Sequence, residues 1–264
     1  MEVVGELINA SRKKIGEAIK ARDADFIQET ARQQRDSGAD YIDVNAGTFV
    51  GKEKECVEWL IQTVQQVVDA PCCIDSPDPE VVDAALKLHQ GAPIINSISL
   101  ESERYNALLP IVTGNECKVV ALCMSDQGMP ESTEDRFSIA EKLVNSLVQK
   151  GVSKDNIYVD PLVQPVSTND SYGVEFLNAI ERIMTELDGV HTICGLSNIS
   201  YGLPKRQLLN RNFAVMGVLK GLDCAIINPL DSQLMADIKA AEVLAGRDTF
   251  CMNFLDAYRA GKLD

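Results

Sequence analysis

Five short apolar runs in the chain end on small polar residues that can accept hydrogen bonds. The residues at these tips are Asp43 with Asn45, Asp75, Asn96, Asp160, and Asn198. A carboxylate accepts two parallel hydrogen bonds from an amidine-like edge, and a carboxamide both donates and accepts. These side chains are therefore suited to bind a flat heterocycle that carries amide and amine groups, provided that the fold brings them together.

Each tip is followed by loop residues and then by a helical stretch, so strand, tip, loop and helix repeat along the chain. Strand-like runs recur eight times, at residues 3–6, 41–45, 72–75, 93–96, 119–124, 157–160, 191–195 and 224–228. Eight such units predict one domain over residues 1–264, a (β/α)8 TIM barrel of the α/β class. In that fold all strands end on the same face, where the tips would converge. A doubly wound sheet is disfavoured because no G-x-G-x-x-G turn follows an early strand.

Local signals mark several helix ends and one long loop. Asp78 before Pro79 is typical of a helix start, and Ser132 with Asp135 resembles a capping box. The longest irregular stretch, 161–172, is expected to form a loop over the face where the tips meet.

Three of the tips also have a simpler structural interpretation. Asp75 could cap the following helix, but Asp78 is better placed to do so. Asn96 could bond its own loop backbone, and Asp160 precedes Pro161 in a common turn pattern. We favour ligand binding for all three, because the ends of barrel strands usually carry the chemistry.

For the remaining candidate residues, the neighbouring sequence says less about whether they bind a ligand or support a loop. Asp43 and Asn45 point to the same side of one strand. One of them could bind the ligand and the other hold a loop, and the sequence leaves open which. Glu6 ends the first strand, and Asn198 lies between Gly195 and Gly202 in a segment expected to approach a ligand closely.

Composition excludes several classes of function. The net charge is −14 and Lys and Arg form no cluster, so nucleic-acid binding is not expected. The eight cysteines contain no C-x-x-C pair and are expected to be buried free thiols in a reducing compartment. With two histidines, a metal site built from His and Cys is not expected. The N-terminus does not resemble a signal peptide and no apolar run could cross a membrane, which predicts a soluble, cytoplasmic protein.

Taken together, the tips and their neighbours resemble one family. The matching segments are Gly5-Glu-Leu-Ile-Asn9, Asp43-Val-Asn45, Ile74-Asp-Ser76, Ile95-Asn-Ser97, Val159-Asp-Pro-Leu162, Gly195-Leu-Ser-Asn-Ile-Ser200, and Gly202-Leu-Pro with Arg206. No single segment is specific, but the set spans nearly the whole chain in order. It is similar to the methyltetrahydrofolate:corrinoid-protein methyltransferases of the pterin-binding family.

This resemblance implies a methyltransferase, often a homodimer, whose substrate is tetrahydrofolate or methyltetrahydrofolate. Asp75, Asn96 and Asp160 would hold the pterin ring, and Asn198 would lie near N5, where the methyl group is carried. Arg206 would help to bind the benzoyl-glutamate tail. The family often has Arg after Glu6, where this chain has Leu7. The resemblance therefore does not identify a partner for Glu6.

The resemblance also implies a partner protein. The chain lacks the Asp-x-His-x-x-Gly pattern of corrinoid-binding modules, so the corrinoid (cobalamin) is expected to arrive on a separate protein. The direction of methyl transfer stays open, and formation of methyltetrahydrofolate in a demethylase system is one direction. The alternatives are a dihydropteroate synthase-like enzyme and a non-catalytic subunit that binds folate or docks a corrinoid protein.

Overall fold

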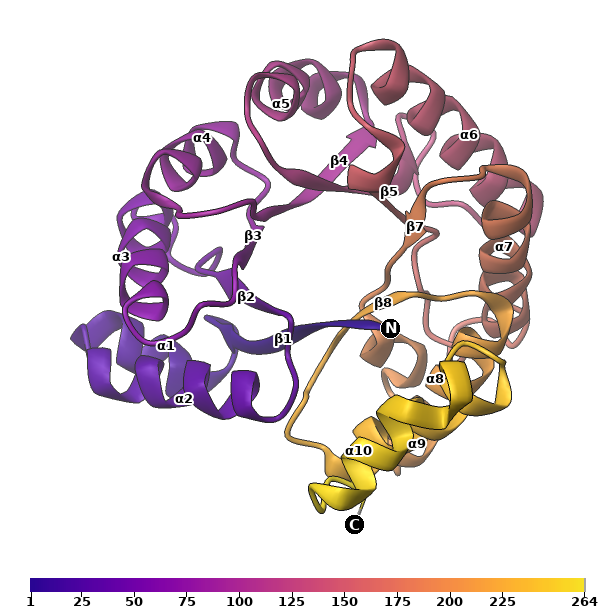
Figure 1. Ribbon diagram of the computed structural model, residues 1–264. Helices are drawn as coiled ribbons and strands as arrows, with labels where there is room; N and C mark the ends of the chain where they lie inside the picture. Colours follow the sequence, from indigo (N-terminus) through magenta and orange to yellow (C-terminus); the bar gives the residue numbers. More distant parts are fainter. Residues whose placement is uncertain (264) are drawn as a thin grey trace.

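A computed structural model describes residues 1–263, and Figure 1 shows a barrel of strands enclosed by helices. The strands are β1 (Glu2–Asn9), β2 (Tyr41–Asn45), β3 (Cys72–Asp75), β4 (Ile94–Leu100), β5 (Lys118–Ser125), β6 (Ile157–Asp160), β7 (His191–Thr192) and β8 (Cys224–Ile227). The helices are α1 (Lys13–Ala21), α2 (Ala24–Asp36), α3 (Glu53–Gln65), α4 (Pro79–Leu88), α5 (Ser102–Gly114), α6 (Thr133–Gln149), α7 (Tyr172–Glu186), α8 (Arg206–Lys220), α9 (Ser232–Leu244) and α10 (Met252–Arg259). Short 3-10 turns are η1 (Lys154–Asn156), η2 (Leu196–Ser200) and η3 (Thr249–Cys251).

All strand pairs are parallel and follow chain order, with β1 paired to both β2 and β8. The seam between β7 and β8 is the least regular part of the barrel. It is joined by a bridge between Gly195 and Ile226, where the Ile226 backbone N–H donates to the Cys194 carbonyl at 2.9 Å. At the start of both strands, the Asp223 carboxylate accepts from the Thr192 backbone N–H at 2.7 Å. The prediction of a TIM barrel is confirmed.

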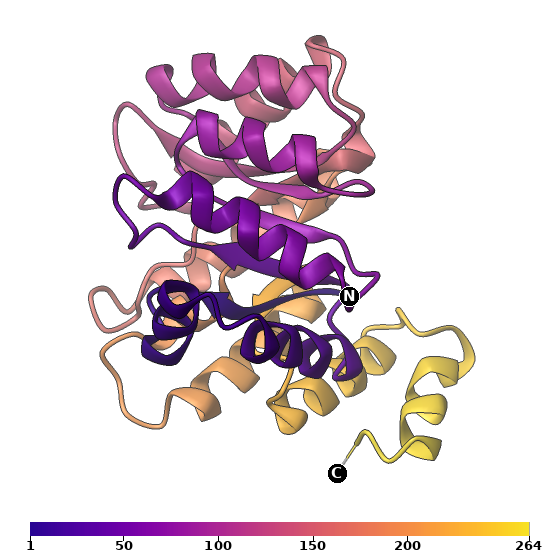
Figure 2. The same ribbon diagram turned by 90° about the vertical axis from the view of Figure 1, so that its left-hand side faces the viewer.

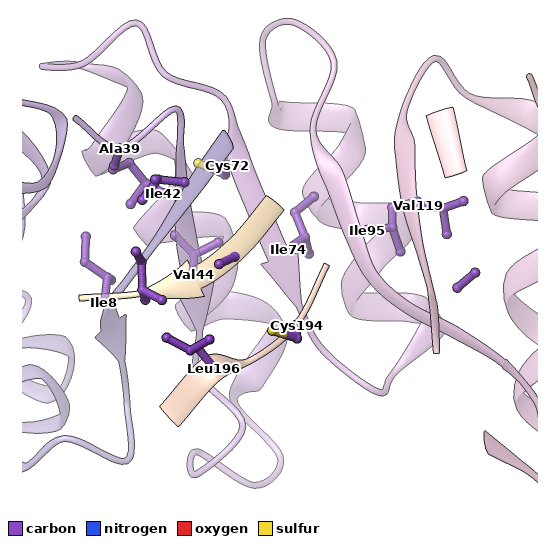
Figure 3. Packing of buried hydrophobic residues seen from close by; sticks show 14 of the residues in the cluster. Ile8, Ala39, Ile42, Val44, Cys72, Ile74, Ile95, Val119, Cys194 and Leu196 are labelled. Atoms are coloured by element: carbon purple, nitrogen blue, oxygen red, sulfur yellow. The ribbon is translucent and has the colours of Figure 1, made fainter. Parts of the chain in front are cut away.

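Apolar residues alternate between the two faces of the barrel wall, as expected for strands that are buried on both sides. The outer face packs against the helices in one large cluster, part of which appears in Figure 3. It includes Ile42, Val44, Ile74 and Ile95. A smaller cluster fills the interior of the barrel: Val4, Tyr41, Cys73, Ile94, Val120, Tyr158, Ile193 and Cys224.

The two ends of the barrel differ. In Figure 2 the long loops that follow the strands lie on the left, whereas both termini lie on the right. The end near the termini is closed by a polar cluster, in which the Lys118 ammonium donates to the Tyr41 and Tyr158 hydroxyls at 2.7 Å each. His191 stacks on Tyr158 in the same place, and its pKa is raised because it contacts Asp223. The opposite end is the one left for a ligand.

Most of the expected element boundaries are found. Asp78 caps α4, and Ser132 forms a capping box with Asp135 at the start of α6. The stretch before Tyr172 is a loop between β6 and α7. The helix after η2 begins at Arg206, directly after Lys205, which adopts a left-handed conformation with φ of 53°. No helix within residues 1–263 is long and apolar enough to span a membrane.

Candidate active site

A cavity of about 400 Å³ opens at the carboxyl ends of the strands. It is lined by Glu6, Asn9, Ser11, Arg12, Asp43, Asp75, Asn96, Asp160, Gly195, Ser197, Asn198 and Ile226. Six of the seven residues proposed from the sequence therefore meet in one place. The seventh, Arg206, lies outside this lining.

The convergence follows from the two-residue period of a strand. Glu6, Asp43, Asp75, Asn96 and Asp160 each lie two residues after a member of the interior cluster. Those preceding residues are Val4, Tyr41, Cys73, Ile94 and Tyr158. The apolar interior thus ends in a layer of polar side chains, which forms the floor of the cavity.

Arg12 is the partner of Glu6, which the sequence left unassigned. Its guanidinium donates to Glu6 at 2.6 Å. Asn9 accepts from the backbone N–H and the hydroxyl of Ser11, at 3.0 and 2.7 Å, and so turns the loop after β1 back over the cavity. Burial raises the pKa of Glu6, whereas the positive charge of Arg12 opposes this shift.

Arg12 is not among the residues predicted from the sequence, because the apolar pattern predicts that the first strand ends at residue 6. β1 continues to Asn9 after an irregularity in its pairing with β2, so the loop that carries Arg12 begins later. Gly5 permits the buried Gln34 side chain to lie against β1, because a Cβ at position 5 would lie 2.5 Å from Oε1, the side-chain amide oxygen of Gln34. That oxygen accepts from the Leu7 backbone N–H at 2.9 Å. The strand next to Glu6 is thereby fixed to α2.

Asn45 orients Asp75. The Asn45 amide donates to Asp75 Oδ2 at 2.8 Å, and its own oxygen accepts from the Gly47 backbone N–H at 3.0 Å. Asn45 is therefore the member of the Asp43/Asn45 pair that holds a loop. Burial raises the pKa of Asp75, although the bond from Asn45 and the positive charge of Arg104 oppose the shift.

Arg104 reaches the back of the site from α5. Its Nε donates to the Ser97 carbonyl at 2.8 Å, directly after Asn96. Asn96 is paired in register with Asp75 across β3 and β4, so these two side chains lie next to each other on the cavity floor.

Asp43 is the most deeply buried of the site carboxyls, with 3% of its surface exposed. Burial raises its pKa well above the ordinary value, and the nearby Asp75 and Glu6 carboxyls add to this effect. Its Oδ1 atom has no hydrogen-bond partner among the described residues.

Asp160 holds the start of the loop that follows β6. Its Oδ1 accepts from the Leu162 backbone N–H at 2.8 Å, and Leu162 adopts a left-handed φ of 66°. Such a conformation costs a branched residue about 1–2 kcal/mol, which the bond to Asp160 helps to offset. Burial raises the pKa of Asp160 to about 7, although the Leu162 bond and the positive charge of the buried Arg136 oppose this.

Asn198 enters the cavity from η2, within the segment that was expected to approach a ligand. This segment is held by the loop between β6 and α7: the Val166 backbone N–H donates to the Ile199 carbonyl at 3.1 Å, and the Ser167 hydroxyl donates to the Tyr201 carbonyl at 2.7 Å. The Asn198 side chain makes no hydrogen bond to another described residue, so its amide is free to contact a ligand.

Arg206 braces the same segment from α8. Its Nη2 donates to the Ser197 carbonyl at 2.7 Å, and its Nε donates to the Ser200 hydroxyl at 3.1 Å. The role suggested for Arg206 in binding the tail of a folate stays a prediction.

The cavity offers an excess of hydrogen-bond acceptors and negative charge. Four carboxyl groups line it, whereas Arg12 is the one basic residue in the described lining and is paired with Glu6. Within residues 1–263, no group of three or more His, Cys, Asp and Glu side chains is arranged to hold a metal ion. The arrangement can bind a polar ring that presents several N–H groups.

Residues 5–228 match the profile of a protein family described as pterin binding enzyme. The chain belongs to this family. Over its full length it is 34% identical to the methylcorrinoid:tetrahydrofolate methyltransferase of Eubacterium limosum, and the match covers 98% of that pterin-binding relative. It is also 30% identical to methionine synthase from Mycobacterium leprae over 240 residues, which are 86% of this chain but 20% of that protein.

Solved structures show the same fold with lower sequence identity. The 7,8-dihydropteroate synthase of Vibrio fischeri aligns with a TM-score of 0.72 and 17% identity, covering 93% of each chain. The enzyme from Thermus thermophilus aligns with a TM-score of 0.68 and 19% identity, again over 93% of each chain. These similarities confirm the barrel of the pterin-binding family and do not distinguish its activities.

Proposed function

We propose that this pterin-binding enzyme is a methyltransferase that moves a methyl group between the cobalt of a corrinoid, carried by a separate protein, and N5 of tetrahydrofolate. The full-length similarity to a methylcorrinoid:tetrahydrofolate methyltransferase is the observation that carries the proposal. The name of that relative also favours the direction from methyl-corrinoid to tetrahydrofolate, which yields methyltetrahydrofolate.

The cavity suits the pterin ring of such a substrate. Asp75, held in place by Asn45, can accept from the 2-amino group and the adjacent ring N–H. Asn96 beside it can pair with a ring edge that has both a donor and an acceptor. Asp160 supplies a further acceptor on the opposite side of the barrel floor.

The protein contributes position and electrostatics to the reaction. The corrinoid supplies a cobalt-bound methyl group that is open to attack by a nucleophile. N5 must be neutral to attack. As the new C–N bond forms, the cobalt–carbon bond breaks and leaves its electron pair on cobalt as cobalt(I), while N5 gains positive charge. The free amide of Asn198 can stabilise that change by turning its oxygen toward N5, and the carboxyls of the cavity favour the positive charge. The proton released from N5 can then pass to one of these carboxyls or to water.

The dihydropteroate synthase-like alternative is less consistent with the charge of the cavity. That reaction releases a phosphate-containing group, for which the family usually provides Lys and Arg near the pterin. Here Arg12 is the one basic residue of the described lining, and it is already paired with Glu6, so the cavity offers no free cation to the leaving group.

We further propose that the enzyme is a cytoplasmic homodimer. The exposed face of α8 supports a dimer, because Leu208, Met216 and Leu219 are 57%, 48% and 72% exposed and recur at helical spacing. Seven of the eight cysteines are buried free thiols, which supports a reducing compartment. Sedimentation equilibrium tests the dimer, and a monomer at micromolar concentration would contradict it.

The activity can be tested with free cobalamins. The protein is mixed with methylcobalamin and tetrahydrofolate, and separately with cob(I)alamin and methyltetrahydrofolate, while the cobalt absorbance is followed. A third mixture contains the substrates of dihydropteroate synthase. Turnover of a cobalamin mixture supports the methyltransferase. Dihydropteroate formation alone would support the alternative, and tight folate binding without turnover would support a binding subunit.

A further inference from the structure

Asp43 differs from the other three carboxyls of the cavity in having no cation, amide or backbone N–H that would stabilise a negative charge. Glu6 is paired with Arg12, Asp75 accepts from Asn45, and Asp160 accepts from a backbone N–H. By contrast, Asp43 Oδ1 is buried without a hydrogen-bond partner in the described chain, although the residue lines the cavity. A buried carboxyl with an unpartnered oxygen, on a residue that lines a cavity, is suited to bind a ligand atom.

The groups that face Asp43 disfavour its charged form. Glu6 on β1 and Asp75 on β3 are like charges that raise its pKa, and the Cys73 thiol on β3, a weak donor, opposes them only in part. Cys72, on the other face of β3, is also close enough for its thiol to be affected by Asp43. A carboxylate that is removed from water costs several kcal/mol unless a cation or strong donors compensate. Burial accordingly raises the pKa of Asp43 well above its ordinary value.

We propose that Asp43 binds the pterin as a neutral carboxylic acid, donating its O–H to a lone-pair acceptor of the ring, whereas Asp75 accepts from ring N–H groups. This inference rests on the proposed function, because it takes the ligand to be a pterin. A pterin presents a carbonyl oxygen and ring nitrogens as well as N–H donors. Asn96 supplies one donor on the cavity floor, and if all the carboxyls around it were ionised the remaining ring acceptors would face negative charge. Asp43 is thereby a residue that determines specificity.

Two substitutions distinguish a neutral Asp43 that donates a hydrogen bond from a charged Asp43 that accepts one. Asp43→Asn keeps a neutral side chain of the same shape that can donate a hydrogen bond, whereas Asp43→Leu removes the donor. Asp75→Asn is the matched control, because it replaces a carboxylate that is expected to be charged. Each variant is first checked for native circular dichroism and cooperative melting.

Calorimetric binding of tetrahydrofolate at pH 7 gives the first readout. We expect Asp43→Asn to weaken binding by at most about threefold, and both Asp43→Leu and Asp75→Asn to weaken it by about tenfold or more. A loss in Asp43→Asn as large as that in Asp75→Asn would overturn the proposal, because it would mean that Asp43 acts as an anion.

Infrared difference spectroscopy of the ligand-free protein gives a readout that does not depend on folate. At pH 7 the wild-type protein should show the C=O stretch of a protonated carboxyl. Asp160, whose pKa is about 7, also contributes to this band, so the assignment is made in an Asp160→Asn background. In that background the band should persist, should be lost when Asp43→Asn is added, and should be retained when Asp75→Asn is added. Its absence from the Asp160→Asn background would overturn the neutral state of Asp43. A protein that shows the band but does not bind tetrahydrofolate would instead refute the pterin-site assignment, and with it the proposed ligand of Asp43.

Discussion

The Asn45 amide donates to the Asp75 carboxylate at 2.8 Å, so a residue that ends β2 fixes the orientation of a residue that ends β3. The same Asn45 side chain accepts from the Gly47 backbone N–H at 3.0 Å. One residue therefore links the loop after β2 to the carboxylate that is best placed to read the amino edge of a pterin.

Asn45→Ala should weaken tetrahydrofolate binding by about tenfold without abolishing it. The carboxylate of Asp75 would lose the donor that orients it and opposes the rise in its pKa. Isothermal titration calorimetry measures the change. Asn212→Ala is the matched control, since Asn212 lies on α8 and its amide bonds only the Leu208 carbonyl within the described chain. Equal affinity of Asn45→Ala and the wild-type protein would show that Asp75 needs no such support.

Asp160 should make the protein less stable as pH rises from 4 to 7. The native state keeps the Asp160 proton up to about pH 7, whereas the unfolded chain loses it near pH 4. Between these values the native state binds more protons, so the free energy of unfolding falls as pH increases. Asp160→Asn keeps an acceptor for Leu162 and removes the charge. At pH 8 it should therefore be more stable than the wild-type protein, by up to about 4 kcal/mol.

Urea denaturation at pH 4 and pH 8 measures this effect. The difference between the two proteins should be small at pH 4, where Asp160 is neutral in both the native state and much of the unfolded chain. Asp188→Asn serves as a control, because Asp188 is exposed and only its backbone carbonyl accepts a hydrogen bond in the described chain. If Asp160→Asn were no more stable than the wild-type protein at pH 8, the burial of a charge at this position would cost nothing.

Asn198→Ala should lower the methyl-transfer rate far more than it weakens folate binding. The Asn198 amide makes no bond to another described side chain, and its proposed contact with N5 strengthens as charge develops there. A loss of about 10²-fold in kcat with less than about threefold in Kd is expected for a group that acts mainly in the transition state. Equal losses in kcat and affinity would make Asn198 a binding residue only. Asn212→Ala again provides the matched amide control.

Arg206→Ala should lower kcat for substrates both with and without a benzoyl-glutamate tail. The two bonds from Arg206 to Ser197 and Ser200 support η2, and no tail is needed to form them. We expect the variant to lower kcat about tenfold or more both with tetrahydrofolate and with a tetrahydropterin that lacks the tail. A loss of kcat with tetrahydrofolate alone would instead support the role implied by the family resemblance, in which Arg206 binds the benzoyl-glutamate tail.

The fold and most of the site could be predicted because both depend on local periodicity. Asp75 and Asn96 end apolar runs, and a parallel barrel places every such end on one face. Arg12 could not be predicted in the same way, because the end of β1 depends on an irregular pairing with β2 that leaves no mark in the strand pattern.

Arg104 and Arg136 could not be predicted from local sequence patterns either. Arg104 lies on α5 and contacts the carbonyl of Ser97, so its relation to the site arises only when that helix packs on β4. Arg136 is fully buried in α6 and lies close enough to Asp160 to oppose the rise in its pKa. Such contacts depend on tertiary packing, whereas the tips depend on the position of each residue along its own strand.

The transfer of a labelled methyl group tests the central claim most directly. Methylcobalamin carrying a ¹³C methyl group is incubated with tetrahydrofolate and the protein, and the products are followed by ¹³C nuclear magnetic resonance. We predict that the label appears on N5 of methyltetrahydrofolate at a rate proportional to the concentration of the protein, and far more slowly with Asn198→Ala. A protein that binds tetrahydrofolate but leaves the label on cobalt, even when supplied with a methylated corrinoid protein, would contradict the assignment as a methyltransferase.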